Sequence, residues 1–126
     1  MSNCETMLFD QAPPLRLIEG HSDIIYIDVW ESNGWPADLT NTPTYFHLME
    51  FSTRDHIWTK KCEPILDMSV NTKNVDYPFT VPVYFLSEDT IGLDGHYTGQ
   101  LELIDFNNES KRPFQNEIIV DKKASL

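Results

Sequence analysis

The segment Asp94-Gly95-His96-Tyr97 constrains the fold more than any other part of this chain. It combines a glycine turn with a tyrosine three residues after an aspartate, and it leads into residues 100–104, where apolar and polar side chains largely alternate. In antiparallel sandwiches, a tyrosine at the corner before a strand can bond its hydroxyl to backbone a few residues upstream. We therefore predict a tyrosine corner in which Tyr97 bonds to backbone within residues 91–94.

Short segments of β character, separated by turn residues, make up most of the rest of the chain. No stretch has the three-to-four-residue apolar spacing over ten or more residues that an amphipathic helix requires. The pattern predicts an all-β fold, an antiparallel β-sandwich of about seven to eight strands. The expected strands cover residues 15–18, 23–30, 44–51, 56–60, 65–70, 79–86, 98–106 and 117–121.

Several of these strands carry more specific expectations. In residues 23–30 the core-facing set is Ile25, Ile27 and Val29, and the outward set is Tyr26, Asp28 and Trp30. Residues 44–51 have apolar groups on both faces, which is typical of a central strand. Pro78 and Pro82 cannot donate to a ladder, so residues 79–86 are expected at a sheet edge or a bulge.

The chain divides into an irregular N-terminal arm, residues 1–13, and a β-sandwich domain, residues 14–126. The arm lacks periodicity and runs into Pro13 and Pro14, which impose extended backbone. The length of 126 residues suits one domain with one core. Aromatic residues make up 12% of the chain, which is too many for a disordered sequence.

The net charge of -11 argues against two kinds of partner. It repels phosphate backbones and anionic lipid headgroups, so we expect neither nucleic acid nor membrane binding. We also expect neither a membrane-spanning segment nor a secretory signal. The two cysteines, Cys4 and Cys62, lie in unlike contexts and are expected to be free thiols, which favours a reducing cytoplasm as the place of assembly.

An ordered series of turn and strand segments resembles the small immunoglobulin-like domains of tailed-phage virion proteins, and is similar to the N-terminal domain of the baseplate upper protein. The segments are residues 15–20, residues 23–30, residues 33–40, Gly95-His96-Tyr97, and Pro113-Phe114 with residues 118–120. The resemblance covers about residues 15–121, although residues 54–78 match nothing in the pattern. It implies an immunoglobulin-like form of the predicted sandwich.

The resemblance also implies a function. A domain of this type with no coiled coil or receptor-binding module after its last strand is expected to be a non-enzymatic structural protein of the virion. It would be a capsid decoration protein or a head or tail accessory subunit, assembled in the host cytoplasm. Its partner would be the major capsid protein or a tail or baseplate protein of the same particle, and a homo-oligomer is an open alternative.

Candidate catalytic residues and metal ligands do not form a familiar constellation in the sequence. The four histidines are His21, His47, His56 and His96, and no pair has the close spacing of a dedicated zinc site. His21, Ser22 and Asp23 contain the residue types of a catalytic triad, but neighbours on an extended strand point to opposite faces. We therefore expect no enzyme activity, no metal and no cofactor.

Two other binding chemistries compete with simpler interpretations. Glu88, Asp89 and Asp94 surround a glycine-containing loop that could supply oxygen ligands to calcium, but their spacing does not fit an EF-hand, and a solvated acidic loop is the favoured interpretation. Trp30, Trp35 and Trp58 could form a flat aromatic platform for sugars or could pack in the fold. The alternative function is therefore a carbohydrate-binding or host-attachment module.

The residues expected to bind a partner lie in two places. Met7, Leu8 and Phe9 are the apolar anchors of the arm, which could order on binding. Tyr26 and Trp30 lie on the outward face of the second expected strand, where they are either covered by a loop or form a subunit contact.

Overall fold

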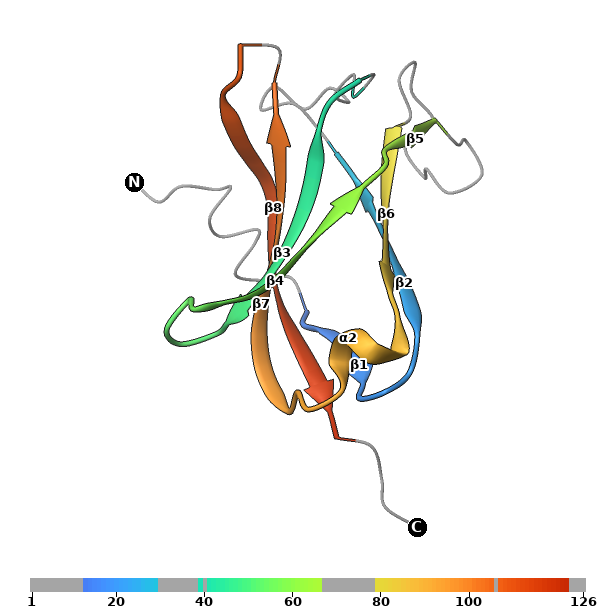
Figure 1. The fold of residues 1–126 in the computed structure, drawn as a ribbon, viewed down its shortest axis with the longest axis vertical. Helices are drawn as coiled ribbons and strands as arrows, with labels where there is room; N and C mark the ends of the chain where they lie inside the picture. The colour runs from blue at the N-terminus through green and yellow to red at the C-terminus, as the bar shows by residue number, and fades with distance from the viewer. Residues whose placement is uncertain (1–12, 30–38, 40, 67–78, 106, 123–126) are drawn as a thin grey trace.

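The fold was examined in a computed structural model, which describes residues 13–29, 39, 41–66, 79–105 and 107–122. Two β-sheets pack face to face (Figure 1). The larger has the strand order β1-β8-β7-β3-β4 and the smaller has the order β2-β6-β5. The elements are β1 (Leu15–Ile18), β2 (Asp23–Asp28), β3 (Thr44–Glu50), β4 (His56–Cys62), β5 (Ile65–Leu66), β6 (Phe79–Phe85), α2 (Ser87–Thr90), β7 (Gly95–Ile104) and β8 (Ser110–Asp121).

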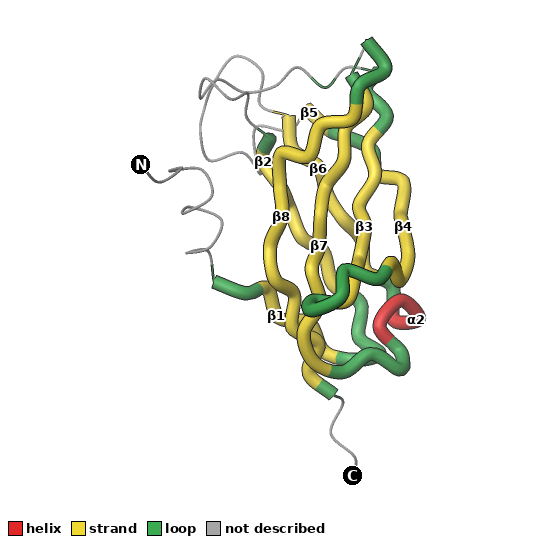
Figure 2. Tube along the Cα trace, turned by 90° about the vertical axis from the view of Figure 1, so that its left-hand side faces the viewer, coloured by secondary structure: helices red, strands yellow, loops and turns green. Residues whose placement is uncertain are grey.

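This strand order confirms the predicted all-β, immunoglobulin-like sandwich. The antiparallel expectation holds for every strand pair except one, because β1 pairs with β8 in parallel. Figure 2 shows the larger sheet face-on, with the smaller sheet behind it and α2 at one end.

Several strand boundaries differ from the prediction. β4 continues to Cys62, whereas the predicted strand ended at Lys60, in a charged part of the sequence. β8 begins at Ser110, seven residues before the predicted start at Glu117. The polar residues at the start of β8 hide its strand character in the sequence, but pairing with β7 continues to Ser110. The expected strand at residues 65–70 is described only over β5, and the arm lies outside the described residues.

Pro82 does not place β6 at a sheet edge, and the register of β6 with β2 is continuous through Pro82, whereas Pro78 lies outside the described residues. β6 is the middle strand of its sheet. Among the described residues, however, β5 pairs only with Phe79 and Thr80. Pro82 therefore lies where β6 has a described neighbour on one side alone, which explains how a central strand accommodates a residue without a backbone donor.

The register of β2 agrees with the prediction, with one exception. Ile27 and Val29 are buried in the core, whereas Tyr26 is exposed. The exception is Asp28, which is half-buried rather than exposed. Its carboxylate accepts a hydrogen bond of 2.7 Å from the hydroxyl of Thr80, and Thr80 is fully buried.

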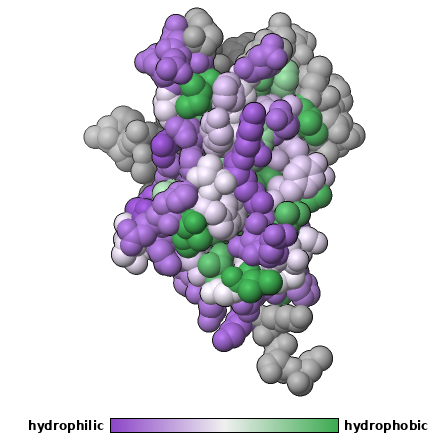
Figure 3. Space-filling view, viewed as in Figure 1, coloured by the Kyte–Doolittle hydropathy of each residue, from purple (hydrophilic) through white to green (hydrophobic). Residues whose placement is uncertain are grey.

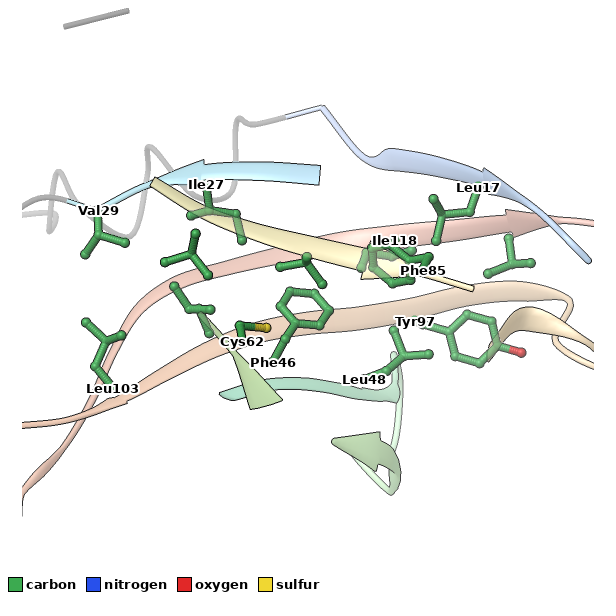
Figure 4. Packing of buried hydrophobic residues seen from close by; sticks show 14 of the residues in the cluster. Leu17, Ile27, Val29, Phe46, Leu48, Cys62, Phe85, Tyr97, Leu103 and Ile118 are labelled. Atoms are coloured by element: carbon green, nitrogen blue, oxygen red, sulfur yellow. The ribbon is translucent and has the colours of Figure 1, made fainter. Parts of the chain in front are cut away.

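The hydrophobic core fills the space between the sheets (Figure 4). The larger sheet contributes Phe46, Leu48 and Ile118, and the smaller sheet contributes Phe85. Phe46 meets Phe85 edge-on, with ring centroids 5.8 Å apart. The sequence predicted that β3 would be a central strand. It lies between β7 and β4 and supplies side chains to the middle of the core.

Cys62 is also buried in this core, although its neighbours in the sequence are charged. It is a free thiol, and burial raises its pKa to about 11. Cys4 lies outside the described residues.

The predicted tyrosine corner is present at the start of β7. The backbone N–H of Asp94 donates to the Tyr97 hydroxyl at 2.9 Å, and the hydroxyl donates to the carbonyl oxygen of Asp94 at 3.3 Å. A second tie joins this corner to the turn after β1, because the N–H of Gly20 donates to the Thr90 hydroxyl at 2.8 Å. These bonds hold one end of the sandwich together.

Candidate functional site

Of the residues predicted to bind a partner, the structure describes only Tyr26. Met7, Leu8, Phe9 and Trp30 lie outside the described residues. The side chain of Tyr26 is 50% exposed on the outer face of β2. Its exposure agrees with the prediction of an outward-facing ring, and a contact with a partner stays a prediction.

Tyr26 belongs to a larger exposed group, which we call the apolar face. Its members are Ile24, Tyr26, Tyr84 and Leu86, and each is between 41% and 55% exposed. Ile24 lies directly opposite Tyr84 in the ladder between β2 and β6, and Tyr26 lies opposite Pro82. Residues opposite each other in a ladder share one face of a sheet, so the three strand members form a contiguous patch. Sequence reasoning missed Tyr84 and Leu86, because only the pairing of β2 with β6 brings them beside Tyr26.

Two shallow hollows flank the apolar face. One, of about 480 Å³, is lined by Ser22 and Asp23 together with members of the apolar face. The other, of about 340 Å³, lies toward β4 and is lined by Lys61 and Glu63 among others. Tyr84 and Leu86 line both hollows and so stand between them. Polar groups therefore border the apolar side chains on both sides, as in the rims of protein interfaces.

Trp58 is not an exposed platform for a sugar. Its ring is half-buried and lies beside Phe46 and Phe85, with ring centroids 6.4 and 5.9 Å away. Its indole N–H donates to the carbonyl oxygen of Asp89 at 3.1 Å, and the Lys60 ammonium sits 5.4 Å from the ring centroid. Trp30 and Trp35 lie outside the described residues.

The acidic loop after β6 has a structural explanation. The carboxylate of Asp89 accepts a hydrogen bond of 2.6 Å from the backbone N–H of Leu86, at the start of α2. The same carboxylate lies 2.7 Å from the Lys60 ammonium. Asp89 thus already has a cation and a backbone donor as partners.

A chain of hydrogen-bonded polar side chains, which we call the polar row, crosses the outer face of the larger sheet. It runs from β4 over β3 and β7 to β8. Its members are His56, Thr59, His47, Glu102, Ser110, Arg112, Gln100 and Gln115. Figure 3 views the molecule along the edges of the sheets, and that side is largely hydrophilic, with hydrophobic side chains gathered in a few places.

The centre of the polar row is the pair His47 and Glu102. Nε2 of His47 lies 2.7 Å from a carboxylate oxygen of Glu102, and these side chains are only 17% and 15% exposed. The Ser110 hydroxyl donates to the other carboxylate oxygen at 2.6 Å. The hydrogen bonds from Ser110 and His47, with the nearby charge of Arg112, lower the pKa of Glu102.

On its other side, His47 faces Thr59 and His56. Nδ1 of His47 and Nε2 of His56 each lie 2.7 Å from the hydroxyl oxygen of Thr59. Thr59, His47 and Glu102 therefore supply a hydroxyl, an imidazole and a carboxylate in series, the types found in hydrolytic triads. None of these three side chains lines either of the two hollows beside the apolar face.

The sequence did not reveal this arrangement. His47 and Glu102 are 55 positions apart and meet because β3 pairs with β7, where Tyr45 lies opposite Glu102. No hydrogen bond joins the described side chains of His21, Ser22 and Asp23, and the Asp23 carboxylate accepts one from the backbone N–H of Ile24. Within the described parts of the chain, no cluster of three or more His, Cys, Asp or Glu side chains is placed to hold a metal ion. No helix in those parts is long and apolar enough to cross a membrane.

Comparison with solved structures shows a likeness of fold. No protein-family model and no curated protein matches the sequence. A solved structure, the crystal structure of CopC from Methylosinus trichosporium OB3b, is similar over 93% of this chain and 92% of that chain. The two sequences are 10% identical and the TM-score is 0.46, so the likeness carries no argument about what this chain binds.

Proposed function

We propose that this chain is a non-enzymatic structural subunit of a virion, which docks on a larger head or tail assembly through the apolar face. The virion part rests on the resemblance of the turn and strand segments to phage immunoglobulin-like domains. The docking part rests on one observation, the contiguous exposure of Ile24, Tyr26, Tyr84 and Leu86 on one sheet face.

The energetics favour docking at this surface. Large exposed apolar patches with polar rims typically mark interaction sites. Each of the four side chains is already about half buried, so full cover by a partner would contribute roughly 0.7–1.5 kcal/mol per side chain, before the cost of ordering. The protein carries a net charge of -11, so the partner surface should be neutral or basic.

The second candidate is a carbohydrate-binding module, and one observation favours it. Tyr26 and Tyr84, both about half exposed, line the hollow that Ser22 and Asp23 border. Aromatic faces stack on pyranose rings, and the polar groups could bond to sugar hydroxyls. This candidate rests on the two tyrosines rather than on Trp58, whose ring is half-buried.

The decisive experiment is addition of purified protein to particles produced from a genome that lacks its coding sequence. We expect wild-type protein to co-sediment with these particles, and Tyr26→Ser and Tyr84→Ser to lose at least tenfold in occupancy. Phe51→Ser is the matched control, because Phe51 is 47% exposed but follows β3 on the larger sheet. Equal occupancy by the wild type and both tyrosine variants would refute docking through the apolar face.

Two further arms of the experiment test the remaining predictions. Deletion of residues 1–12 asks whether Met7, Leu8 and Phe9 add to binding, and full occupancy by this variant would show that they do not. A glycan array tests the second candidate. Binding of wild-type protein to neutral glycans that both tyrosine substitutions abolish would support it, and no binding would exclude it.

A further inference from the structure

We propose that His47 and His56 form a surface site for a divalent transition-metal ion, with zinc as the reference ion. The inference is independent of the proposed docking function and concerns the opposite sheet. It starts from the way two imidazole nitrogens converge on one point. Nδ1 of His47 and Nε2 of His56 each lie 2.7 Å from the Thr59 hydroxyl oxygen, so they are separated by no more than twice that distance.

Glu102 prepares His47 to act as a ligand. A carboxylate only accepts hydrogen bonds, so the contact of 2.7 Å requires the proton of a neutral His47 ring on Nε2. Nδ1 then carries the free lone pair, and it points toward Thr59 and His56. Metal-binding histidines usually donate their other ring N–H to a carboxylate or carbonyl in this way, which fixes the ring and raises its basicity.

Both histidines come from neighbouring strands, which gives the site a firm base. His47 lies opposite Thr59 in the ladder between β3 and β4, and His56 lies opposite Met49 beside a register shift. The two rings have centroids 6.2 Å apart. A tetrahedral zinc ion binds imidazole nitrogen at about 2.0–2.1 Å, so the two nitrogens must come to roughly 3.4 Å from each other. His56 is exposed and can turn toward the ion, whereas His47 is held by Glu102.

The surroundings define the kind of ion. Imidazole suits zinc, copper and nickel, whereas magnesium and calcium prefer oxygen ligands. Of the described residues, only these two imidazoles converge here, so water or the Thr59 hydroxyl would complete the coordination. The affinity should accordingly be weaker than that of a closed four-ligand zinc site.

The test is isothermal titration calorimetry with zinc chloride at about pH 7.5. The background protein carries no histidine tag, and Cys4→Ser removes a competing thiol. We expect one ion per chain, no comparable heat with magnesium, and at least tenfold weaker zinc binding in His47→Ala and in His56→Ala. Glu102→Gln should weaken binding by about 10- to 100-fold, because the carboxylate behind the ligand is lost.

His96→Ala is the matched control. His96 also contacts a carboxylate, that of Glu117, but no second imidazole faces it among the described residues. The His96→Ala variant should bind zinc as tightly as the background protein does. A second readout, by NMR, keeps the test valid if His47→Ala fails to fold. In the background protein, which keeps all four histidines, zinc should shift the ring nitrogen resonances of His47 and His56 and leave those of His21 and His96 in place. Absence of binding tighter than about 1 mM, or unchanged binding in His56→Ala, would overturn the proposal.

Discussion

The backbone of Asp94 and the hydroxyl of Tyr97 exchange two hydrogen bonds, one of 2.9 Å from the Asp94 N–H and one of 3.3 Å to its carbonyl oxygen. Tyr97 is only 5% exposed, so its ring is anchored in the core while its hydroxyl closes the turn before β7. The contact therefore couples the turn to the packing between the sheets.

Tyr97→Phe should destabilise the protein by about 0.5–1.5 kcal/mol, because it removes the hydroxyl and leaves the ring in place. Chemical denaturation measures the change. Tyr84→Phe is the control, because its exposed side chain has little to lose. Identical unfolding curves for Tyr97→Phe and wild type would remove the corner from the list of stabilising features.

Gly99→Ala should destabilise the protein by roughly 1–3 kcal/mol through overpacking. A Cβ at this position would lie 2.5 Å from Cδ1 of Ile118 and from Cζ of Phe46, and both residues are fully buried. Ile118→Val removes one of the two clashing atoms. The double variant should therefore lose less than the sum of the single changes, and strict additivity would contradict this explanation.

Ile27→Ala should cost roughly 2–5 kcal/mol, because Ile27 is buried between the sheets. Asp28→Ala should cost about 1–3 kcal/mol, more than an exposed site allows, because it leaves the buried Thr80 hydroxyl without this acceptor. Thr80→Val in the same background should recover part of that loss. Denaturation midpoints measure these changes. An Asp28→Ala variant as stable as wild type would show that the hydrogen bond between Thr80 and Asp28 contributes nothing to stability.

Glu102 should make stability depend on pH in acid. Its pKa is lowered in the folded state, so its contribution is present above the ordinary value of 4.5 and is lost as the pH falls through the lowered folded value. The difference in unfolding free energy between wild type and Glu102→Gln should therefore shrink from about pH 6 to about pH 3. Ser110→Ala should reduce this dependence. A difference that stays constant over the range would contradict the assignment.

Cys62 should be unreactive in the folded protein. Burial raises its pKa to about 11, partly offset by the charge of Lys60, so almost no thiolate exists at pH 8. Alkylation mapped by mass spectrometry should be slow at Cys62 until urea unfolds the chain. The same shift stabilises the fold below the ordinary value of 9.0, and this contribution is lost as the pH rises through 11. Equal labelling rates in native and unfolded protein would contradict the burial.

Local patterns predicted much of the architecture. The alternation in β2 set its inward face, and the turn before Tyr97 predicted the corner bond, because both depend on residues close together in the chain. The long β8 was predicted only at its end, and the parallel pairing of β1 was missed. Polar residues can form a strand when a partner strand is present to pair with them. The start of β8 therefore depends on its pairing with β7 and cannot be predicted from the residues of β8 alone.

The sequence by itself determined the fold class, the core face of β2 and the exposure of Tyr26, because side-chain period and turn chemistry act over a few residues. Only the tertiary structure decided which side chains gather at the two proposed surfaces. Tyr84 joins Ile24, and Glu102 meets His47, because strands distant in the chain pair in one register. A shift of one residue would send each of these side chains to the other face, and that register is a property of the assembled sheets.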